Sequence, residues 1–342
     1  MPIDTKRREI TLALATLPSL ALSFADAGGL GIDESGFFKI GGIDQWISIQ
    51  GRDATNPVIL YLHGGPAEAQ SPFLKEFLPW QEHFTVVNWD QRGSGKTYGR
   101  NGASTPGMDT PESAVEQLTA DAIEVATTVS KRLAKRKIIL VGQSWGTILG
   151  LHVIKRRPDL FYAFVGTGEF VNWARGLQEL ERLARLEAAA ANDQETLKSL
   201  HQVAALPPTD MRRIGASGKY RMVPTDLEYL KIQRDFIGPP PPPTTGDVAD
   251  WIAGGGFSLP KLLPAVFSFD AMTFAPVLPV PFFVIQGRDD HVAPAVLARE
   301  YVSRVRAPRK AFTTIQGGHF ACFTSPGEFV TALRKNLHPL VG

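Results

Sequence analysis

The sequence predicts an α/β protein in which a mostly parallel, eight-stranded sheet is flanked by helices and interrupted by a helical cap. Three observations support this prediction. The chain has 342 residues, enough for one large domain with an insertion. Past residue 30, short β-rich runs alternate with helical patterns, which is typical of parallel sheets covered by helices on both faces. Over residues 168–270 this alternation stops, and helical segments follow one another without a strand.

Eight runs have the composition of strands. Residues 37–40 and 46–50 are expected to form a hairpin around Gly41 and Gly42. Residues 58–62 are apolar throughout, as expected of a strand that is buried on both faces. The other five predicted strands are residues 84–89, 138–141, 161–165, 282–285 and 311–315.

The helix predicted over residues 111–135 has one apolar face. Its apolar positions, among them Val115, Leu118 and Ala122, are spaced by three and four residues. Thr110 is a plausible N-cap because Pro111 then occupies the first helical position.

The block between the sixth and seventh strands is predicted to be the cap. Helices are expected over residues 178–191, 197–205 and 226–236. Five consecutive prolines at residues 239–243 cannot form a helix or a central strand. We therefore assign residues 28–167 and 271–342 to the core and residues 168–270 to the helical cap.

Composition excludes several classes of partner and cofactor. The 36 Lys and Arg residues are scattered and nearly balanced by 34 Asp and Glu residues, so a nucleic-acid partner is not expected. No apolar run reaches the roughly 18–20 residues that cross a bilayer, so the mature chain is not expected to insert into a membrane. The single cysteine, Cys322, allows neither an intramolecular disulfide nor a cysteine-based zinc site, and we expect it to be a buried apolar filler. No metal-ligand pattern or phosphate-binding loop is present, so we expect neither a metal nor a cofactor.

Residues 1–27 have the order of an export signal. Lys6, Arg7 and Arg8 precede an apolar stretch at residues 10–22, and the small-residue site 25–27 follows. The paired arginines resemble a twin-arginine signal. This pattern predicts a periplasmic or secreted protein, and the alternative is a cytoplasmic enzyme with an N-terminal tail. Nothing in the sequence indicates the oligomeric state.

A Gly-x-Ser-x-Gly segment marks the candidate nucleophile. Gly142, Ser144 and Gly146 lie between the predicted strand 138–141 and a helical stretch at residues 147–155. This context defines the nucleophile elbow, whose tight turn needs glycine on both sides of the serine. We expect Ser144 to project above the sheet, where a neighbouring base can take its proton.

The base and the acid are expected to follow Ser144 in the order acid, then histidine. His319 comes directly after the last predicted strand, at the sheet edge where catalytic loops gather. Two adjacent aspartates, Asp289 and Asp290, follow the preceding strand. Asp290 is preferred because a triad needs a buried carboxylate behind the imidazole, whereas Asp289 is expected to be a surface charge. His291 is expected to point away from the site.

The segment 63–66, His-Gly-Gly-Pro, follows the buried strand 58–62. In this position it predicts an oxyanion loop. One donor is expected to be the backbone N–H of Gly64 or Gly65, and the other is that of Trp145. Each such donor typically lowers the barrier by about 3–4 kcal/mol. His63 itself is expected to brace the loop.

Four segments in order resemble the proline iminopeptidases of the α/β-hydrolase superfamily. They are residues 63–66, the Asp-Gln-Arg-Gly-Ser-Gly box at residues 90–95, the elbow at residues 142–146, and the pair Asp290 and His319. The resemblance implies the α/β-hydrolase fold with a helical cap. It also implies a serine hydrolase that cleaves a small amide or peptide bond by an acyl-enzyme mechanism, releasing an N-terminal residue such as proline from a small-molecule or short-peptide substrate.

Two positions depart from the family pattern, because Ala67 stands where the oxyanion loop usually has glycine and Gln143 stands where the elbow usually has glycine. The family binds the free amine of its substrate with acidic groups of the cap. Glu169 is the best candidate here for this substrate-binding role, although its position also fits a charge at a helix N-terminus. The alternative function is an esterase or amidase that acts on an uncharged acyl substrate. A binding protein without activity is disfavoured because every catalytic role has a candidate residue.

Overall fold

The computed structural model describes residues 31–341, so the predicted export signal at residues 1–27 lies outside the described residues. Within this range, eight strands form one sheet in the order β1-β2-β4-β3-β5-β6-β7-β8. The pairs β1–β2 and β2–β4 are antiparallel and the other neighbours are parallel. The strands are β1 (Ile32–Ile40), β2 (Ile43–Gly51), β3 (Val58–Leu62), β4 (Thr85–Trp89), β5 (Ile138–Gln143), β6 (Phe161–Thr167), β7 (Phe282–Gly287) and β8 (Lys310–Ile315). The predicted fold class is therefore confirmed.

Two apolar cores enclose the sheet because its central strands are buried on both faces. One face is covered by α3 (Pro111–Arg132), α4 (Trp145–Arg156) and α11 (Ala295–Arg304). The other face is covered by α1 (Leu78–Gln81), α12 (Ala321–Thr324) and α13 (Pro326–Val341). Cys322 is fully buried in this second core, as predicted. Thr110 caps α3, accepting a hydrogen bond from the Ser113 N–H at 3.2 Å.

The segment between β6 and β7 is helical. Its helices are α5 (Trp173–Ala190), α6 (Gln194–Val203), α7 (Met211–Ser217), α8 (Pro224–Ile237) and α9 (Asp247–Ser268). Helices α5, α6 and α8 correspond to the three predicted ones. Helices α7 and α9 were not predicted, because α7 is short and α9 contains three consecutive glycines and two internal prolines, which have low helix propensity. The five prolines lie in the connection between α8 and α9.

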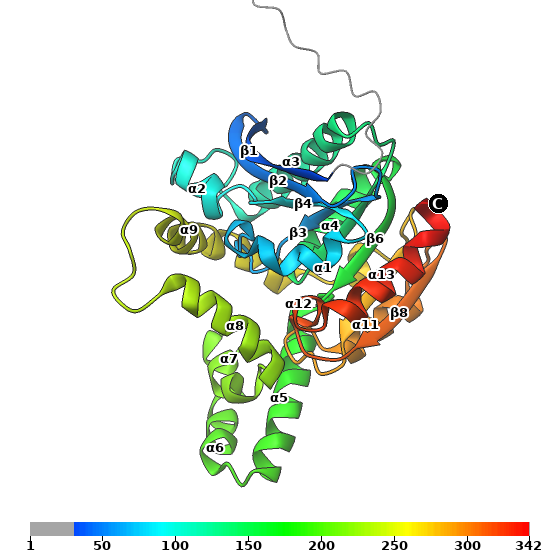
Figure 1. Cartoon of the computed structure of the whole chain (residues 1–342). Helices are drawn as coiled ribbons and strands as arrows, with labels where there is room; N and C mark the ends of the chain where they lie inside the picture. Colours follow the sequence, from blue (N-terminus) through cyan, green and yellow to red (C-terminus); the bar gives the residue numbers. More distant parts are fainter. Residues whose placement is uncertain (1–30, 342) are drawn as a thin grey trace, which may run out of the picture.

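The cap helices have two different relations to the core. Helices α5 to α8 project away from the sheet (Figure 1). Helix α9 instead packs against α2 (Gly95–Asn101) and α3. The short helix α10 (Ala271–Phe274) then leads back to β7. Among residues 31–341, no helix is long and apolar enough to span a membrane.

Candidate active site

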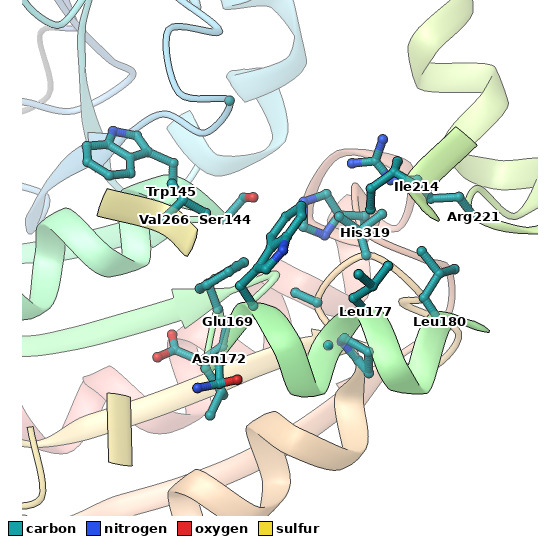
Figure 2. A pocket seen from close by; sticks show the side chains of 18 of the residues that line it. Ser144, Trp145, Glu169, Asn172, Leu177, Leu180, Ile214, Arg221, Val266 and His319 are labelled. Carbon is teal, nitrogen blue, oxygen red and sulfur yellow. The ribbon is translucent and has the colours of Figure 1, made fainter. Parts of the chain in front are cut away.

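Ser144 lies on a sharp turn between β5 and α4. Its backbone has φ 53° and ψ −118°, a conformation that is strained for a residue with a side chain. A Cβ atom on Gly142 would collide with the backbone of Gly146, and one on Gly146 would collide with the carbonyl oxygen of Leu62. Glycine is therefore required on both sides, as predicted, and the turn directs the Ser144 hydroxyl into a cavity (Figure 2).

His319 and Asp290 form a buried pair at the same cavity. The Nδ1 atom of His319 lies 3.0 Å from Oδ2 and 3.1 Å from Oδ1 of Asp290. Asp290 is 2% exposed, whereas the neighbouring Asp289 is exposed and makes no contact of this kind. The Asp290 carboxylate also accepts hydrogen bonds from the N–H groups of Val292 and Ala293 and from the side chain of Gln286, at 2.9, 2.8 and 2.8 Å. Asp290 thus fixes the orientation of the imidazole through Nδ1, and Nε2 is left to face the cavity.

Neighbouring carboxylates raise the pKa of His319. Burial lowers the pKa of His319, but the charge and hydrogen bond of Asp290, together with the charge of Asp226, raise that pKa above its ordinary value. Arg221 acts in the opposite direction, because its positive charge lowers the pKa of His319. An imidazole with a raised pKa is a stronger proton acceptor, which suits a general base.

Two residues that support this pair were not predicted from the sequence. Asp226 of α8 accepts the backbone N–H of His319 at 3.0 Å and that of Phe320 at 2.9 Å. Gln286, at the end of β7, donates to Asp290 and accepts the backbone N–H of Glu169 at 2.9 Å. Gln286 could have been noticed in the sequence, since it is a polar residue in an otherwise apolar strand. Asp226 could not, because only the packing of the cap brings it to His319.

The predicted oxyanion loop lies beside Ser144. Gly65 and Trp145 line the cavity together with Ser144, and Trp145 is the first residue of α4, so its N–H has no partner within the helix. Gly64 lies behind them, against the side chain of Gln143, and its carbonyl accepts the N–H of Glu68 at 3.1 Å. Of the two predicted glycines, Gly65 therefore faces the cavity.

His63 braces this loop as a neutral side chain. Burial lowers its pKa to about 4. Its Nδ1 lies 3.0 Å from the Gly64 carbonyl, and its Nε2 accepts the N–H of Gln91 at 3.2 Å. The Gln91 side chain donates to the His63 carbonyl at 3.1 Å and accepts from the Trp145 indole at 3.0 Å. The Asp-Gln-Arg-Gly-Ser-Gly box thereby joins the oxyanion loop to the elbow.

The cavity has a volume of about 450 Å³ and lies between the core and the cap. Most of its lining side chains are apolar, including Leu177 and Leu180 of α5, Ile214 of α7 and Val266 of α9 (Figure 2). Besides His319, the lining includes three residues with ionisable side chains: Glu68, Glu169 and Arg221. The volume is typical of a site for a small ligand.

Glu169 is a buried acid without a partner. It is 1% exposed, and neither carboxylate oxygen has a hydrogen-bond partner among residues 31–341. Burial raises its pKa to about 8. It does not cap a helix, because α5 begins at Trp173 and is capped by Asn172. The two oxygens are themselves buried, beside Gly166 of β6, and an unpaired buried carboxylate is stabilised by a cation.

The fold and the site define the class of this protein. Residues 57–326 match the family model described as the alpha/beta hydrolase fold, and the chain belongs to this family.

Several similar sequences and structures carry the names of peptidases or of proteins related to them. The chain is 27% identical over 317 residues to the probable aminopeptidase YbaC of Bacillus subtilis, which covers 87% of this chain and 94% of that protein. It is 24% identical over 198 residues to the proline iminopeptidase of Lactobacillus helveticus, which covers 57% of each chain. The solved structure of a proline iminopeptidase-related protein from Thermus thermophilus matches 91% of this chain and 99% of its own, with a TM-score of 0.62 and 21% identity. The structure of the proline iminopeptidase of Mycobacterium smegmatis matches 90% and 99%, with a TM-score of 0.59 and 17% identity. The predicted resemblance to proline iminopeptidases is therefore confirmed.

Proposed function

We propose that this protein is a serine hydrolase that cleaves a small amide or peptide bond, as an aminopeptidase of the proline iminopeptidase type. One observation carries the proposal: the strained Ser144 turn and the buried His319–Asp290 pair, with its 3.0 Å contact, open into the same cavity. A nucleophile, a base and a group that orients the base are the parts that acyl transfer needs.

In the proposed mechanism, Ser144 Oγ attacks the carbonyl carbon of the substrate while His319 Nε2 takes the hydroxyl proton. The C–N bond then breaks, and His319 delivers that proton to the leaving amine, which leaves an acyl group on Ser144. Water attacks this ester and gives its proton to His319, and the proton returns to Ser144 as the acid is released. Asp290 stays ionised and stabilises the imidazolium formed in each half of the reaction.

The N–H groups of Gly65 and Trp145 are the proposed donors to the oxyanion. Both residues line the cavity beside Ser144. They are held by the bracing network of His63 and Gln91, so little reorganisation is needed when the negative charge develops.

Glu169 is the proposed receptor for the free amino group of the substrate. Glu169 lines the same cavity as Ser144, and its buried carboxylate oxygens have no partner among the described residues. An ammonium group would supply the missing charge and hydrogen bonds, which repays the desolvation of both ions. The names of the relatives support this reading, because aminopeptidases and iminopeptidases act at a free N-terminus.

A specific observation favours the alternative, an esterase or amidase for an uncharged acyl group. Because the pKa of Glu169 is raised to about 8, this side chain is mostly neutral at pH 7 in the empty cavity. A neutral acid in an apolar pocket can accommodate an uncharged substrate.

The discriminating experiment compares proline arylamide, its N-acetylated form and a short-chain nitrophenyl ester. We expect the free-amine arylamide to have the highest kcat/KM and N-acetylation to abolish its cleavage. Equal or faster cleavage of the blocked compound would overturn the aminopeptidase proposal and support the alternative.

The serine mechanism has a separate test. A fluorophosphonate probe should label Ser144 covalently, and the Ser144→Ala variant should not be labelled. Ser325, a half-buried serine directly after α12, supplies the control, since Ser325→Ala should label like the wild type. Labelling of the Ser144→Ala variant at another residue would contradict the assigned nucleophile.

A further inference from the structure

Arg221 projects into the cavity without a protein partner. Among residues 31–341, no hydrogen bond or ion pair engages its guanidinium, although it lines the cavity with Ser144 and His319. Two arginines of the neighbouring α7, by contrast, form ion pairs. Arg212 pairs with Asp210 and Arg213 with Glu181, each at 2.7 Å or less. Since a guanidinium keeps its charge at all physiological pH values, Arg221 presents a cation without a direct hydrogen-bond partner to a ligand in the cavity.

The backbone on either side of Arg221 is fastened to the loops that carry the acid and the base. The carbonyl of Tyr220 accepts a hydrogen bond from Nδ1 of His291, at 2.8 Å, and His291 directly follows Asp290. Asp226, five residues after Arg221, holds the N–H groups of His319 and Phe320. Arg221 is therefore presented from a fixed position, as a preorganised binding group requires.

Arg221 and Glu169 serve different parts of the cavity. Figure 2 shows Arg221 on the far side of His319 from Glu169. Burial raises the pKa of Glu68, and the charges of His319 and Arg221 oppose that rise. The Glu169 carboxylate instead packs against Gly166 of β6, where a Cβ atom would collide with it. Since Glu169 is the proposed receptor for the amine of the acyl residue, we assign the Arg221 side to the leaving residue.

We propose that Arg221 binds the free carboxylate of the leaving residue, so that the substrates are dipeptides with a free amine at one end and a free carboxylate at the other. This inference rests on the proposed function. The planar guanidinium fits a carboxylate with two parallel hydrogen bonds, which gives direction as well as charge. The 450 Å³ cavity is of a size for a ligand of this kind and holds Arg221 on the side away from Glu169.

Glu68 should affect the preference for a free carboxylate in the direction opposite to Arg221. It lies in the same cavity, and its electrostatic coupling to Arg221 places it on the Arg221 side. When ionised, it repels a ligand carboxylate. Removing this charge should therefore increase the preference for a free carboxylate, in the direction opposite to removal of Arg221.

The test uses two substrates that differ only in the terminal charge: a dipeptide ending in alanine and the same dipeptide as its C-terminal amide. The first residue is the one whose arylamide the enzyme cleaves fastest. We expect the wild type to have a kcat/KM about 10- to 100-fold higher for the free acid, the range that a charged hydrogen-bonded pair provides. Arg221→Gln should bring the ratio close to one, and Arg221→Lys should give an intermediate ratio. Glu68→Gln should raise the ratio. The matched control is Arg212→Gln, which removes an exposed, paired arginine of the cap and should leave the wild-type ratio.

Two outcomes would overturn the inference: equal kcat/KM for the acid and the amide in the wild type, or an unchanged ratio in Arg221→Gln. Failure of the proposed function has a different signature. In that case free-amine arylamides, which carry no carboxylate, are not cleaved, or the fluorophosphonate does not label Ser144.

Discussion

Asp226 of the cap accepts the backbone N–H of His319 at 3.0 Å, so a residue in the first turn of α8 holds the loop that carries the proposed base. Gly318 precedes this histidine, and a Cβ atom there would collide with the Asp226 carboxylate. The stacking of Tyr229 on Phe320 and Phe323, with centroids 4.6 and 4.9 Å apart, adds a second contact between α8 and the loop. The cap therefore positions the catalytic loop as well as covering the cavity.

Removing the Asp226 charge should alter the pH profile of the enzyme. The charge of Asp226 raises the pKa of His319, so Asp226→Asn should move the acidic limb of kcat/KM to lower pH. It should also lower kcat about 10-fold or more, because a charged hydrogen bond that orients the loop is weakened. The control is Asp235→Asn on the same helix, whose carboxylate is exposed and pairs only with Lys231. An unmoved acidic limb would limit Asp226 to a structural role.

The two adjacent aspartates should differ sharply in their effect on turnover. Asp290→Asn should lower kcat by roughly 10⁴-fold, since the imidazole would lose the carboxylate that sets its tautomer and stabilises its charged form. Asp289→Asn should change kcat less than about 3-fold, because this side chain is exposed. Steady-state kinetics on the free-amine arylamide measures both. The reverse order of effects would move the acid role to Asp289.

Glu169→Gln should separate stability from activity. The pKa of Glu169 is raised from 4.5 to about 8, so between these pH values the folded protein holds a proton that the unfolded chain has released. Stability is therefore lost as pH rises through this window, by an amount on the order of 3 kcal/mol at pH 7. We expect Glu169→Gln to flatten this dependence and to raise the Tm at pH 8, while abolishing cleavage of free-amine substrates.

The control for this variant is Glu195→Gln, an exposed residue of α6, which should change neither property. Thermal unfolding at several pH values between 5 and 9 measures the effect. A Tm for Glu169→Gln that stays at or below the wild-type value at pH 8 would contradict it.

Ala67, the residue at which the oxyanion loop departs from the family pattern, is in the left-handed region with φ 73°. Such a conformation costs roughly 1–2 kcal/mol for a residue with a side chain, whereas glycine adopts it freely. Ala67→Gly should therefore leave the free energy of unfolding unchanged or raise it by up to about 1 kcal/mol, after the entropy that glycine adds to the unfolded chain.

The matched control is Ala126→Gly, in the middle of α3, which should lower the free energy of unfolding by about 1 kcal/mol or more. Chemical denaturation of both variants provides the comparison. A similar loss in both would show that Ala67 is not strained.

The strands could be predicted because each central one is a continuous apolar run that is buried on both faces, as in β3 and β7. The capped start of α3 also has a local cause, in Thr110 and Pro111. Helix α9 could not be predicted, because its glycines and prolines disfavour a helix and its packing against α2 and α3 stabilises it.

The site residues also divide into those that local sequence places and those that depend on the packing of the cap. Ser144, Asp290 and His319 follow strands of one sheet, so their sequence spacing places them at one edge. Asp226 and Arg221 reach that edge only through the folding of the cap, and no local pattern indicates that path. The export signal stays a prediction, and a comparison of the N-terminus of the protein recovered from cells with residue 1 would test it.

The cap is attached to the core at several places, among them α9 on α2 and α3 and α8 on the His319 loop. A cap held in this way limits the length of the substrate chain that can reach Ser144. Under the proposed function, intact proteins are then excluded from the site without an inhibitor or a precursor form. The proposed aminopeptidase would depend on earlier endopeptidase cleavage for its substrates.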